Sequence, residues 1–244
     1  MMVTGASRGI GAAIALLAGK NGYSVGVNYV RSEAAAQAVV KAIQTAGGKA
    51  VALQADVGQQ EEVKAMFGQL DQAFGAPDAL VNNAGMLASF RVDTADEDNV
   101  LEVFRANVFS AYYCSREAIR RMSTAHSGKG GVIINMSSVA ARLGGLGGGA
   151  AYAASKGAID SFTLALAKEV GAEGIRVNAI RPGLISTEIH NVHGGIAKME
   201  IMAKSAVPLG RAGSALEVAE AALWLASDAS SYVHGSVIDV AGGR

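Results

Sequence analysis

Short apolar runs alternate with longer alanine-rich or amphipathic segments along the chain. The runs at residues 24–29, 49–54 and 131–137 predict buried strands, whereas residues 150–170 predict a long helix. Repeated alternation of the two patterns predicts a parallel sheet with right-handed crossovers. We therefore expect one α/β domain over residues 1–244, a Rossmann-like doubly wound sheet with helices on both faces and ligands at the carboxyl ends of its strands.

Local signals place the ends of several helices. Ser32 is a predicted N-cap, and residues 94–97 and 214–217 form capping boxes, each with a hydroxyl three residues before a carboxylate. The first box should open a long helix that contains Asn107. The second should open a helix that buries Trp224 in the core.

Composition narrows the class of protein. Half of the residues are apolar and 17% are charged, which suits a sheet covered on both faces. The formal net charge of +0 gives no reason to expect nucleic acid or an anionic membrane as a partner. No apolar run approaches the ~20 residues of a membrane span and the N-terminus lacks a secretion signal, so we expect a cytoplasmic protein. The single cysteine, Cys114, cannot form an internal disulfide and is expected to be a buried thiol.

The first glycine-rich stretch is typical of a loop that binds a diphosphate. It follows a short apolar segment and precedes a helical run, and it reads Thr4-Gly5-Ala6-Ser7-Arg8-Gly9-Ile10-Gly11. Glycines allow a tight turn and a close approach to a ligand, while the amides of the new helix N-terminus point towards an anion. The spacing is G-x-x-x-G-x-G rather than the commoner G-x-G-x-x-G, and an ordinary strand-to-helix turn is the alternative.

The stretch around the long predicted helix carries the candidate chemistry. Tyr152 and Lys156 are four residues apart, so their side chains share one face of that helix. A phenol with a pKa of about 10 transfers protons poorly at neutral pH, but a nearby ammonium group favours the phenolate. Ser138 ends a strand and is a candidate to hold a carbonyl oxygen. The Tyr–Lys spacing alone is weak evidence, because such pairs also occur on solvated helix faces.

Residues 188–207 and the helical residue Asn107 are further candidates for the site. Residues 188–207 are poorly patterned, and we interpret them as a flap over a pocket. His190 and His193 lie there, but without a cysteine or clustered carboxylates they do not indicate a metal site, and no metal is expected. Asn107 is a candidate site residue, although an Asn inside a helix usually faces solvent or caps a local carbonyl.

Four features in this order give the chain a resemblance to the short-chain dehydrogenase/reductase superfamily over essentially its whole length. They are the loop from Thr4 to Gly11, the run Asn82-Asn83-Ala84-Gly85, the pair Tyr152 and Lys156, and Pro182-Gly183. Within the superfamily the chain resembles 3-oxoacyl-carrier-protein reductases and sugar-dehydrogenase-like oxidoreductases. The resemblance implies about seven strands in the order 3-2-1-4-5-6-7. It also implies hydride transfer between a nicotinamide cofactor and a small-molecule carbonyl or secondary alcohol.

The resemblance implies roles for individual residues. Tyr152 is expected to be the general acid/base, Lys156 to lower its pKa and hold the nicotinamide ribose, and Ser138 to bind the substrate oxygen. Asn107 is expected to support a water-linked proton path. Asp56 with Val57 is expected at the adenine, Asn83 to Gly85 at the ribose and nicotinamide, and Ile185 with Thr187 at the carboxamide. The residues expected at the cofactor are Gly5, Ser7, Arg8, Gly9, Ile10, Gly11, Asn28, Arg31, Ser32, Asp56, Val57, Asn83, Ala84, Gly85, Tyr152, Lys156, Pro182, Gly183, Ile185 and Thr187.

The end of the second predicted strand indicates which cofactor is used. Enzymes of this fold that prefer NAD place an acidic residue there, where its carboxylate accepts from the ribose and repels a 2′-phosphate. Here the first acid is Glu33, whereas Arg31, Asn28 and Ser32 can donate to a phosphate and Arg8 adds a second cation. We predict NADPH over NADH, with NAD still possible. A solvated loop position for Arg31 is the alternative.

The chain departs from the family pattern in two places. The usual gap from the serine to the tyrosine is thirteen positions, whereas Tyr152 is fourteen positions after Ser138, so Ser137 is the fallback. The chain begins only a few residues before Gly5, so the first strand should be shorter than the family norm.

The sequence also bears on alternative functions and on the oligomeric state. A cofactor-binding regulator that has lost turnover is the main alternative, against which the intact Ser138, Tyr152 and Lys156 argue. Epimerases and dehydratases of related fold tend to be longer than this chain. The helices predicted at 99–122 and 150–170 are too apolar for one buried face each, so we expect a homo-oligomer, a tetramer or dimer with two-fold axes.

Overall fold

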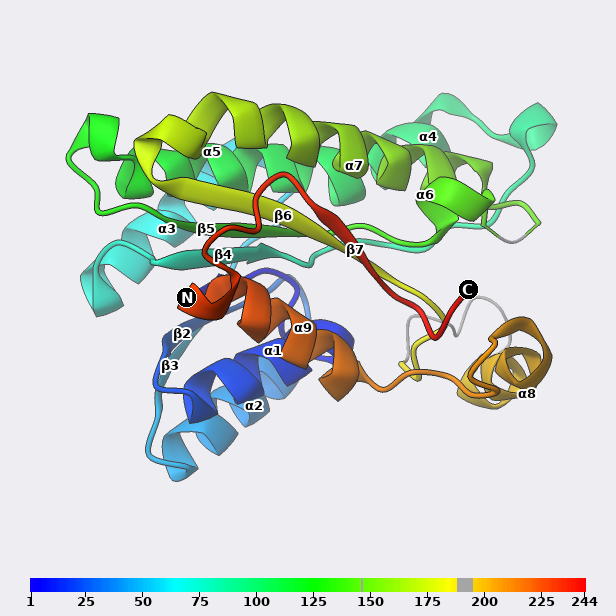
Figure 1. Ribbon diagram of the computed structural model, residues 1–244, viewed down its shortest axis with the longest axis horizontal. Helices are drawn as coiled ribbons and strands as arrows, with labels where there is room; N and C mark the ends of the chain where they lie inside the picture. Colours follow the sequence, from blue (N-terminus) through cyan, green and yellow to red (C-terminus); the bar gives the residue numbers. More distant parts are fainter. Residues whose placement is uncertain (146, 188–194) are drawn as a thin grey trace.

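A seven-stranded parallel sheet with the order β3-β2-β1-β4-β5-β6-β7 forms the centre of the molecule (Figure 1). The computed structural model describes residues 1–145, 147–187 and 195–244. The predicted doubly wound sheet and its strand order are confirmed. The strands are β1 (Met2–Val3), β2 (Ser24–Tyr29), β3 (Lys49–Gln54), β4 (Ala79–Asn82), β5 (Gly131–Met136), β6 (Ile175–Pro182) and β7 (Val237–Val240).

Helices cover both faces of this sheet (Figure 1). One face is covered by α1 (Gly9–Lys20), α2 (Glu33–Thr45) and α9 (Ala215–Ala226). The other face is covered by α3 (Gln60–Phe74), α5 (Ser110–Met122) and α7 (Ala150–Val170). Three further helices, α4 (Glu97–Phe104), α6 (Ala140–Leu143) and α8 (Gly195–Ala206), lie towards the carboxyl ends of the strands.

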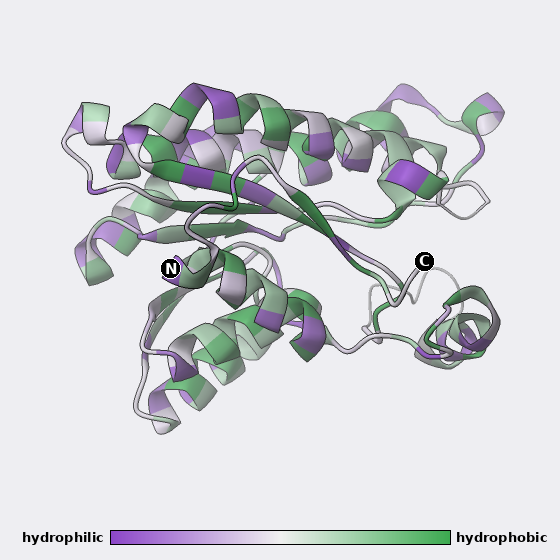
Figure 2. Ribbon diagram, in the orientation of Figure 1, coloured by the Kyte–Doolittle hydropathy of each residue, from purple (hydrophilic) through white to green (hydrophobic). Residues whose placement is uncertain are grey.

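The central strands are apolar at successive positions because both of their faces are buried. Leu80 and Ile133 pack under α3 and α5, whereas the next residues in each strand, Val81 and Ile134, pack under α1 and α9. All four side chains are fully buried. In Figure 2 the strands are predominantly hydrophobic, whereas the helices on either side of the sheet carry both hydrophobic and hydrophilic residues.

The chain crosses from one half of the sheet to the other beside β1. This strand pairs with β2 on one side and β4 on the other, so Met2 lies between Gly26 and Leu80. It is two residues long, as expected, and both residues are fully buried. The loops after β1 and β4 therefore meet at the point where the strand order reverses, which is where open α/β sheets bind ligands.

The predicted long helix from residue 94 onwards begins and continues differently. Asp96 is the N-cap, and its carboxylate accepts from the Asn99 backbone at 2.8 Å, so the predicted capping box at 94–97 is wrong. Thr94 instead ends a short 3-10 turn and donates to the Arg91 carbonyl. Between α4 and α5 the chain widens into a π-helical turn, Arg105–Phe109, which contains Asn107. Such wide turns are frequent at functional sites.

The structure confirms some of the other predicted helix caps and buried residues and contradicts others. The capping box of Ser214 with Glu217 is confirmed. Ser32 occupies an N-cap position but its side chain makes no capping bond. Trp224 is 42% exposed, so the prediction that it is buried in the core is wrong, because it lies on the side of α9 that faces away from the sheet. Cys114 is fully buried, and burial raises the pKa of its thiol.

The predicted flap is described only in its second half. Residues 188–194, with His190 and His193, lie outside the described residues. From Gly195 the chain forms α8, whose Met199 and Ala203 pack against Leu184 in a small apolar cluster apart from the main core. Among the helices that the structure describes, none is long and apolar enough to span a bilayer.

Candidate active site

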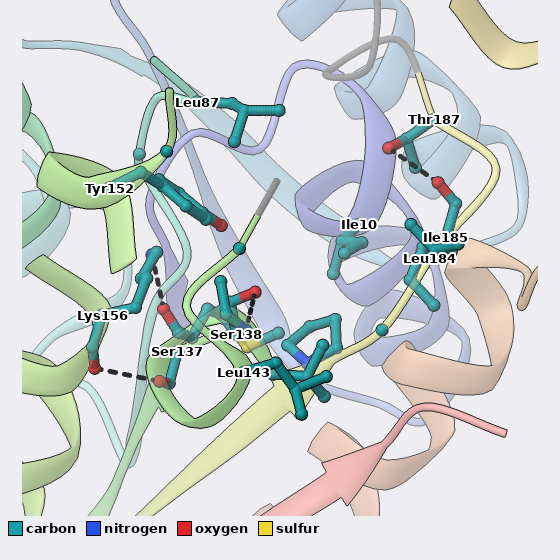
Figure 3. A pocket seen from close by; sticks show the side chains of 18 of the residues that line it. Ile10, Leu87, Ser137, Ser138, Leu143, Tyr152, Lys156, Leu184, Ile185 and Thr187 are labelled. Atoms are coloured by element: carbon teal, nitrogen blue, oxygen red, sulfur yellow. Dashed lines mark hydrogen bonds between the residues drawn. The ribbon is translucent and has the colours of Figure 1, made fainter. Parts of the chain in front are cut away.

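A cleft opens at the carboxyl ends of β1, β4, β5 and β6. Figure 3 shows Tyr152 and Lys156 on one side of it and Ile10, Ile185 and Thr187 across the opening. Of the residues predicted for the site, those that line this cleft are Ile10, Asn83, Gly85, Ser138, Tyr152, Lys156, Pro182, Gly183, Ile185 and Thr187. The sheet thus brings together segments that lie far apart in the sequence, as the predicted topology requires.

The glycine loop after β1 reaches this cleft through its backbone. Gly5 and Gly9 have φ angles of 59° and 58°, a conformation that L side chains rarely adopt. A Cβ on Gly5 would lie 2.9 Å from the Ala84 Cα, and one on Gly9 would lie 3.7 Å from Thr187. The backbone at Gly5 and Gly9 therefore lies close to the loops after β4 and β6, and Ile10 contributes a side chain to the cleft.

The loop ends at a helix N-terminus that is open to an anion. Helix α1 begins at Gly9 with Arg8 as its N-cap, no side chain caps its first turn, and no acidic residue lies there. A Cβ on Gly11 would lie 2.5 Å from both the Gly5 carbonyl and the Asn83 amide nitrogen. Amides with no capping side chain and a backbone that must be glycine fit a bound diphosphate.

Thr4 and Asn83 tie the loop after β4 to the glycine loop. The buried Thr4 hydroxyl accepts from the Asn83 and Ala84 backbone amides, each at 2.9 Å. The Asn83 side chain donates to the Thr4 and Gly5 carbonyls at 2.9 and 3.1 Å. Sequence reasoning gave Thr4 no such role, although its place directly before the glycine loop was visible.

The Asn28 side chain holds the glycine loop by a hydrogen bond. Its side-chain oxygen accepts from the Gly5 amide at 3.0 Å, and its amide group donates to the Leu53 and Ala55 carbonyls at 3.2 and 3.0 Å. It is fully buried. The prediction that Asn28 donates directly to a phosphate is therefore wrong, since both amide hydrogens are already used.

The other residues predicted near the adenine end lie beyond the cleft. Arg31 and Ser32 connect β2 to α2, and the Arg31 side chain is exposed. Asp56 follows β3, and its carboxylate accepts from the Gly58 amide at 2.9 Å. The Val57 side chain packs in the core, so its backbone is what remains for a ligand. Ser7 and Arg8 lie in the glycine loop.

Tyr152 lies on the first turn of α7 beside Ser138. Burial raises the pKa of the Tyr152 phenol, and a hydrogen bond with the Ser138 hydroxyl opposes that rise. The net direction is upward, which corrects the expectation that Lys156 brings this pKa down. The Lys156 nitrogen lies 5.8 Å from the centre of the Tyr152 ring. At neutral pH the phenol therefore keeps its proton.

The neighbouring serines have different environments. Ser137 is buried and donates to the Lys156 carbonyl at 3.1 Å, which holds β5 to α7. Ser138 faces the cleft, and its hydroxyl accepts from the Ala140 amide at 3.1 Å in addition to its contact with Tyr152. The loop between α6 and α7 contains Gly144 and Gly145, whose φ angles are 81° and 77°.

Lys156 is a buried amine with limited contacts. It is 5% exposed and donates to the Met136 carbonyl at 2.8 Å. A Cβ on Gly85 would lie 3.5 Å from its nitrogen, so the amine faces the β4 loop. Burial lowers the pKa of Lys156 to about 8, while the charge of Asp160 acts in the opposite direction.

Asn107 links the π turn to both sides of the cleft. Its side chain accepts from the Met86 amide at 2.8 Å and donates to the Met86 carbonyl and to Ser155, at 3.1 and 2.9 Å. Ser155 donates in turn to the Tyr152 carbonyl at 2.7 Å. A chain of hydrogen bonds thus connects the β4 loop to the turn that carries Tyr152. Sequence reasoning missed Ser155, because a serine inside a helix gives no signal of a partner far away in the chain.

The remaining walls of the cleft are largely apolar. Pro182 ends β6 and Gly183 follows it. A Cβ on Gly183 would lie 2.8 Å from the Ala241 Cα, so only glycine fits. Thr187 is buried and donates to the Ile185 carbonyl. The lining residues that sequence reasoning did not name as site residues include Met86, Leu87, Val139, Leu143, Leu184 and Arg244.

Comparison with known proteins agrees with this arrangement. A family model described as Enoyl-(Acyl carrier protein) reductase matches residues 5–244. The chain is 49% identical to the uncharacterized oxidoreductase YgfF of Escherichia coli (strain K12), over 100% of this chain and 98% of that protein. It is 37% identical to the 3-oxoacyl-[acyl-carrier-protein] reductase FabG of Staphylococcus aureus (strain Mu50 / ATCC 700699), over 99% and 96%.

A solved structure shares the whole fold. It is a short chain dehydrogenase from Burkholderia cenocepacia J2315 in complex with NADP, with a TM-score of 0.91 and 32% sequence identity. The match covers 99% of this chain and 96% of that one.

Proposed function

The chain belongs to the short-chain dehydrogenase/reductase superfamily of oxidoreductases, and we propose that it is an NADP(H)-dependent enzyme that acts on a carbonyl or secondary alcohol. The observation that carries the proposal is the grouping of Ser138, Tyr152 and Lys156 on one wall of a cleft that the glycine loop borders. When bound, the nicotinamide supplies or accepts the hydride. Carbonyl reduction is the favoured direction.

Tyr152 is the proton donor in this proposal. Its phenol has a pKa raised by burial and keeps its proton at neutral pH, so it can donate to the alkoxide oxygen that forms as the carbonyl is reduced. The Ser138 hydroxyl lies beside it and holds the same oxygen by hydrogen bond. Both groups stabilise negative charge where it develops.

Lys156 and Asn107 complete the proposed machinery. Among the described residues the Lys156 ammonium donates to the Met136 carbonyl, and its remaining hydrogens can donate to a ribose. Its positive charge also stabilises the phenolate that remains after proton transfer. Asn107 holds Met86 and Ser155, which fixes the wall on which the proton path to solvent would begin.

NADP(H) is the proposed cofactor, with the diphosphate on the N-terminus of α1. The solved relative described above holds NADP. In this chain no acid lies between the end of β2 and Glu33, while Arg31 is exposed and Arg8 lies in the glycine loop. Guanidinium groups recognise phosphate through charge-assisted hydrogen bonds. These features favour a 2′-phosphate over a free ribose hydroxyl.

We also propose that the protein works as a homo-oligomer. Phe109 in the turn before α5, Tyr112 on α5 and Leu164 on α7 are 40%, 57% and 45% exposed. Tyr112 packs against Phe162 of α7 at 5.8 Å between ring centres, which makes one apolar surface across the two helices. Light scattering at micromolar concentration should give a dimer or tetramer, and a monomer would contradict this.

The activity is tested with the purified chain and a panel of aldehydes, ketones, sugars and acyl thioesters. Each is mixed with NADPH or NADH, and cofactor oxidation is followed by absorbance. We expect turnover with at least one carbonyl class, faster with NADPH. Tight NADPH binding with no turnover on any class would favour the regulator, and a wild-type preference for NADH would reject the cofactor proposal.

A further inference from the structure

Asp160 lies one helical turn beyond Lys156 on α7, and a single arginine holds its carboxylate. Arg181 of β6 donates to Asp160 Oδ2 from Nε at 3.0 Å and from Nη2 at 2.8 Å. The Asp160 and Arg181 side chains are 13% and 21% exposed, so this ion pair is mostly shielded from water. Residues four apart on a helix share a face, which brings the carboxylate to the same side of α7 as the Lys156 amine.

The two oxygens of the Asp160 carboxylate have different surroundings. Within the described parts of the chain, Asp160 Oδ1 is buried and receives no hydrogen bond. Buried acceptors nearly always have a donor, so an exception calls for a physical explanation. Arg181 directs Nε and Nη2 to Oδ2 and Nη1 to Asp239, so Oδ1 of Asp160 lies inside the protein without a donor from this arginine.

We propose that Asp160, fixed by Arg181, is a positioning residue that keeps the buried Lys156 amine protonated at neutral pH. The catalytic consequence rests on the proposed function, because Lys156 must be charged to stabilise the Tyr152 phenolate. A buried amine tends to lose its charge unless a negative group lies near it. Asp160, four residues after Lys156 on the same helix, supplies that negative group.

The electrostatics of Lys156 agree with this geometry. Burial lowers its pKa to about 8, and Asp160 is the charged group that opposes the fall. Removal of the negative charge should therefore lower the pKa further. A fall of about one unit would reduce the charged fraction at pH 7 from roughly nine-tenths to about half.

Other charged groups near α7 have different partners or positions. Tyr152 is neutral at this pH, and Arg142 of α6 donates to Asp239, which also accepts from Arg181 at 3.5 Å. The remaining charged side chains on elements packed against α7 are bonded elsewhere or exposed, and they are Glu97, Asp98, Glu102, Arg105, Glu173 and Arg176.

The test is a titration of Lys156 in Asp160→Asn. Lysine labelled with carbon-13 at Cε reports its charge by NMR, and the Lys156 signal is identified by its loss in Lys156→Met. In the wild type we expect a midpoint near 8, and in Asp160→Asn a midpoint lower by about 0.5–1 pH unit. Asp239→Asn is the matched control, because it removes another carboxylate from Arg181 and should leave the Lys156 midpoint in place.

Additional variants keep the inference testable if Asp160→Asn folds poorly. Asp160→Asn with Arg181→Met leaves no unpaired guanidinium and should still lower the midpoint, while Asp160→Glu should restore it. An unchanged midpoint in both variants that lack Asp160, or an equal shift in Asp239→Asn, would overturn the inference.

The activity profile gives a second readout. For Asp160→Asn the alkaline fall of kcat/KM should move to lower pH in parallel with the NMR midpoint. Because the titration needs no turnover, a protein that failed every substrate test would still decide the role of Asp160. Failure of the proposed function and failure of this inference are thus distinguishable.

Discussion

The two sides of the cleft are built by different means. The side formed by β1, β2 and α1 presents backbone: glycines with positive φ, helix amides, and the buried supports Thr4 and Asn28. The side formed by β5 and α7 presents buried side chains. Ser137 donates to the Lys156 carbonyl and Ser155 donates to the Tyr152 carbonyl. The first side depends on the room that glycine backbone leaves for a ligand, whereas the second depends on the reactive groups of its side chains. Substitutions on the first should therefore impair binding, and substitutions on the second should impair turnover.

Tyr152→Phe should give the largest effect of any single change. The ring and helix remain but the transferable proton is lost, so kcat/KM should fall by at least about 10²-fold. NADPH binding, measured by fluorescence titration, should stay close to that of the wild type. Retention of a near-normal rate would show that the chemistry does not reside on the β5–α7 side.

Gly11→Ala tests the backbone side. Its Cβ would lie 2.5 Å from the Gly5 carbonyl and from the Asn83 amide, so the loop must shift. We expect the Kd for NADPH to rise at least about tenfold, which corresponds to ~1.4 kcal/mol. Gly68→Ala is the control, because a Cβ at this position of α3 meets no atom within 4 Å. It should leave binding unchanged, and an equal loss in both variants would contradict the steric account.

Arg31→Ala sharpens the account of cofactor choice. Loss of one phosphate contact should lower kcat/KM with NADPH about tenfold and leave NADH nearly unchanged. Lys41→Ala, at an exposed position late in α2, should change neither value. Equal losses with both cofactors would mean that Arg31 does not recognise the 2′-phosphate.

Ser155→Ala should give the smallest effect. It removes the donor to the Tyr152 carbonyl and the acceptor for the Asn107 amide. We expect the free energy of unfolding to fall by about 1–3 kcal/mol, because the Asn107 amide is left with an unmade bond. Activity should fall several-fold at most. Ser205→Ala, at an exposed position on α8, is the control in denaturant titrations. An equal loss of stability in this control would contradict the proposed role of Ser155.

The sequence predicted the backbone side more completely than the side-chain network. The strands and the glycine loop follow from patterns with short periods or fixed spacings, whereas the strand order was expected from the family resemblance. The spacing of Tyr152 and Lys156 likewise predicts that the two share one face of a helix. Asn28 was misjudged because its residue type suits a phosphate, whereas its burial under the loop appears only when β2 and β3 pair. The direction of the Tyr152 pKa was misjudged because burial, which dominates it, depends on the folded cleft.

Partners that are far apart in the chain also could not be predicted. Asp160 and Arg181 come from α7 and β6, and nothing in either local sequence indicates that they form an ion pair. Asn107 was named from resemblance, but its bonds to Met86 and Ser155 depend on the π turn, which the helical pattern did not predict.

The most direct test of the central claim follows the hydride itself. The wild-type enzyme is incubated with NADPH carrying two deuterium atoms at C4 of the nicotinamide and with a carbonyl compound from the panel, and the product is analysed by mass spectrometry. We predict an alcohol with one deuterium on the former carbonyl carbon, formed at least about 10²-fold more slowly by Tyr152→Phe. A protein that binds the labelled cofactor but transfers no deuterium to any carbonyl compound would contradict the proposed function.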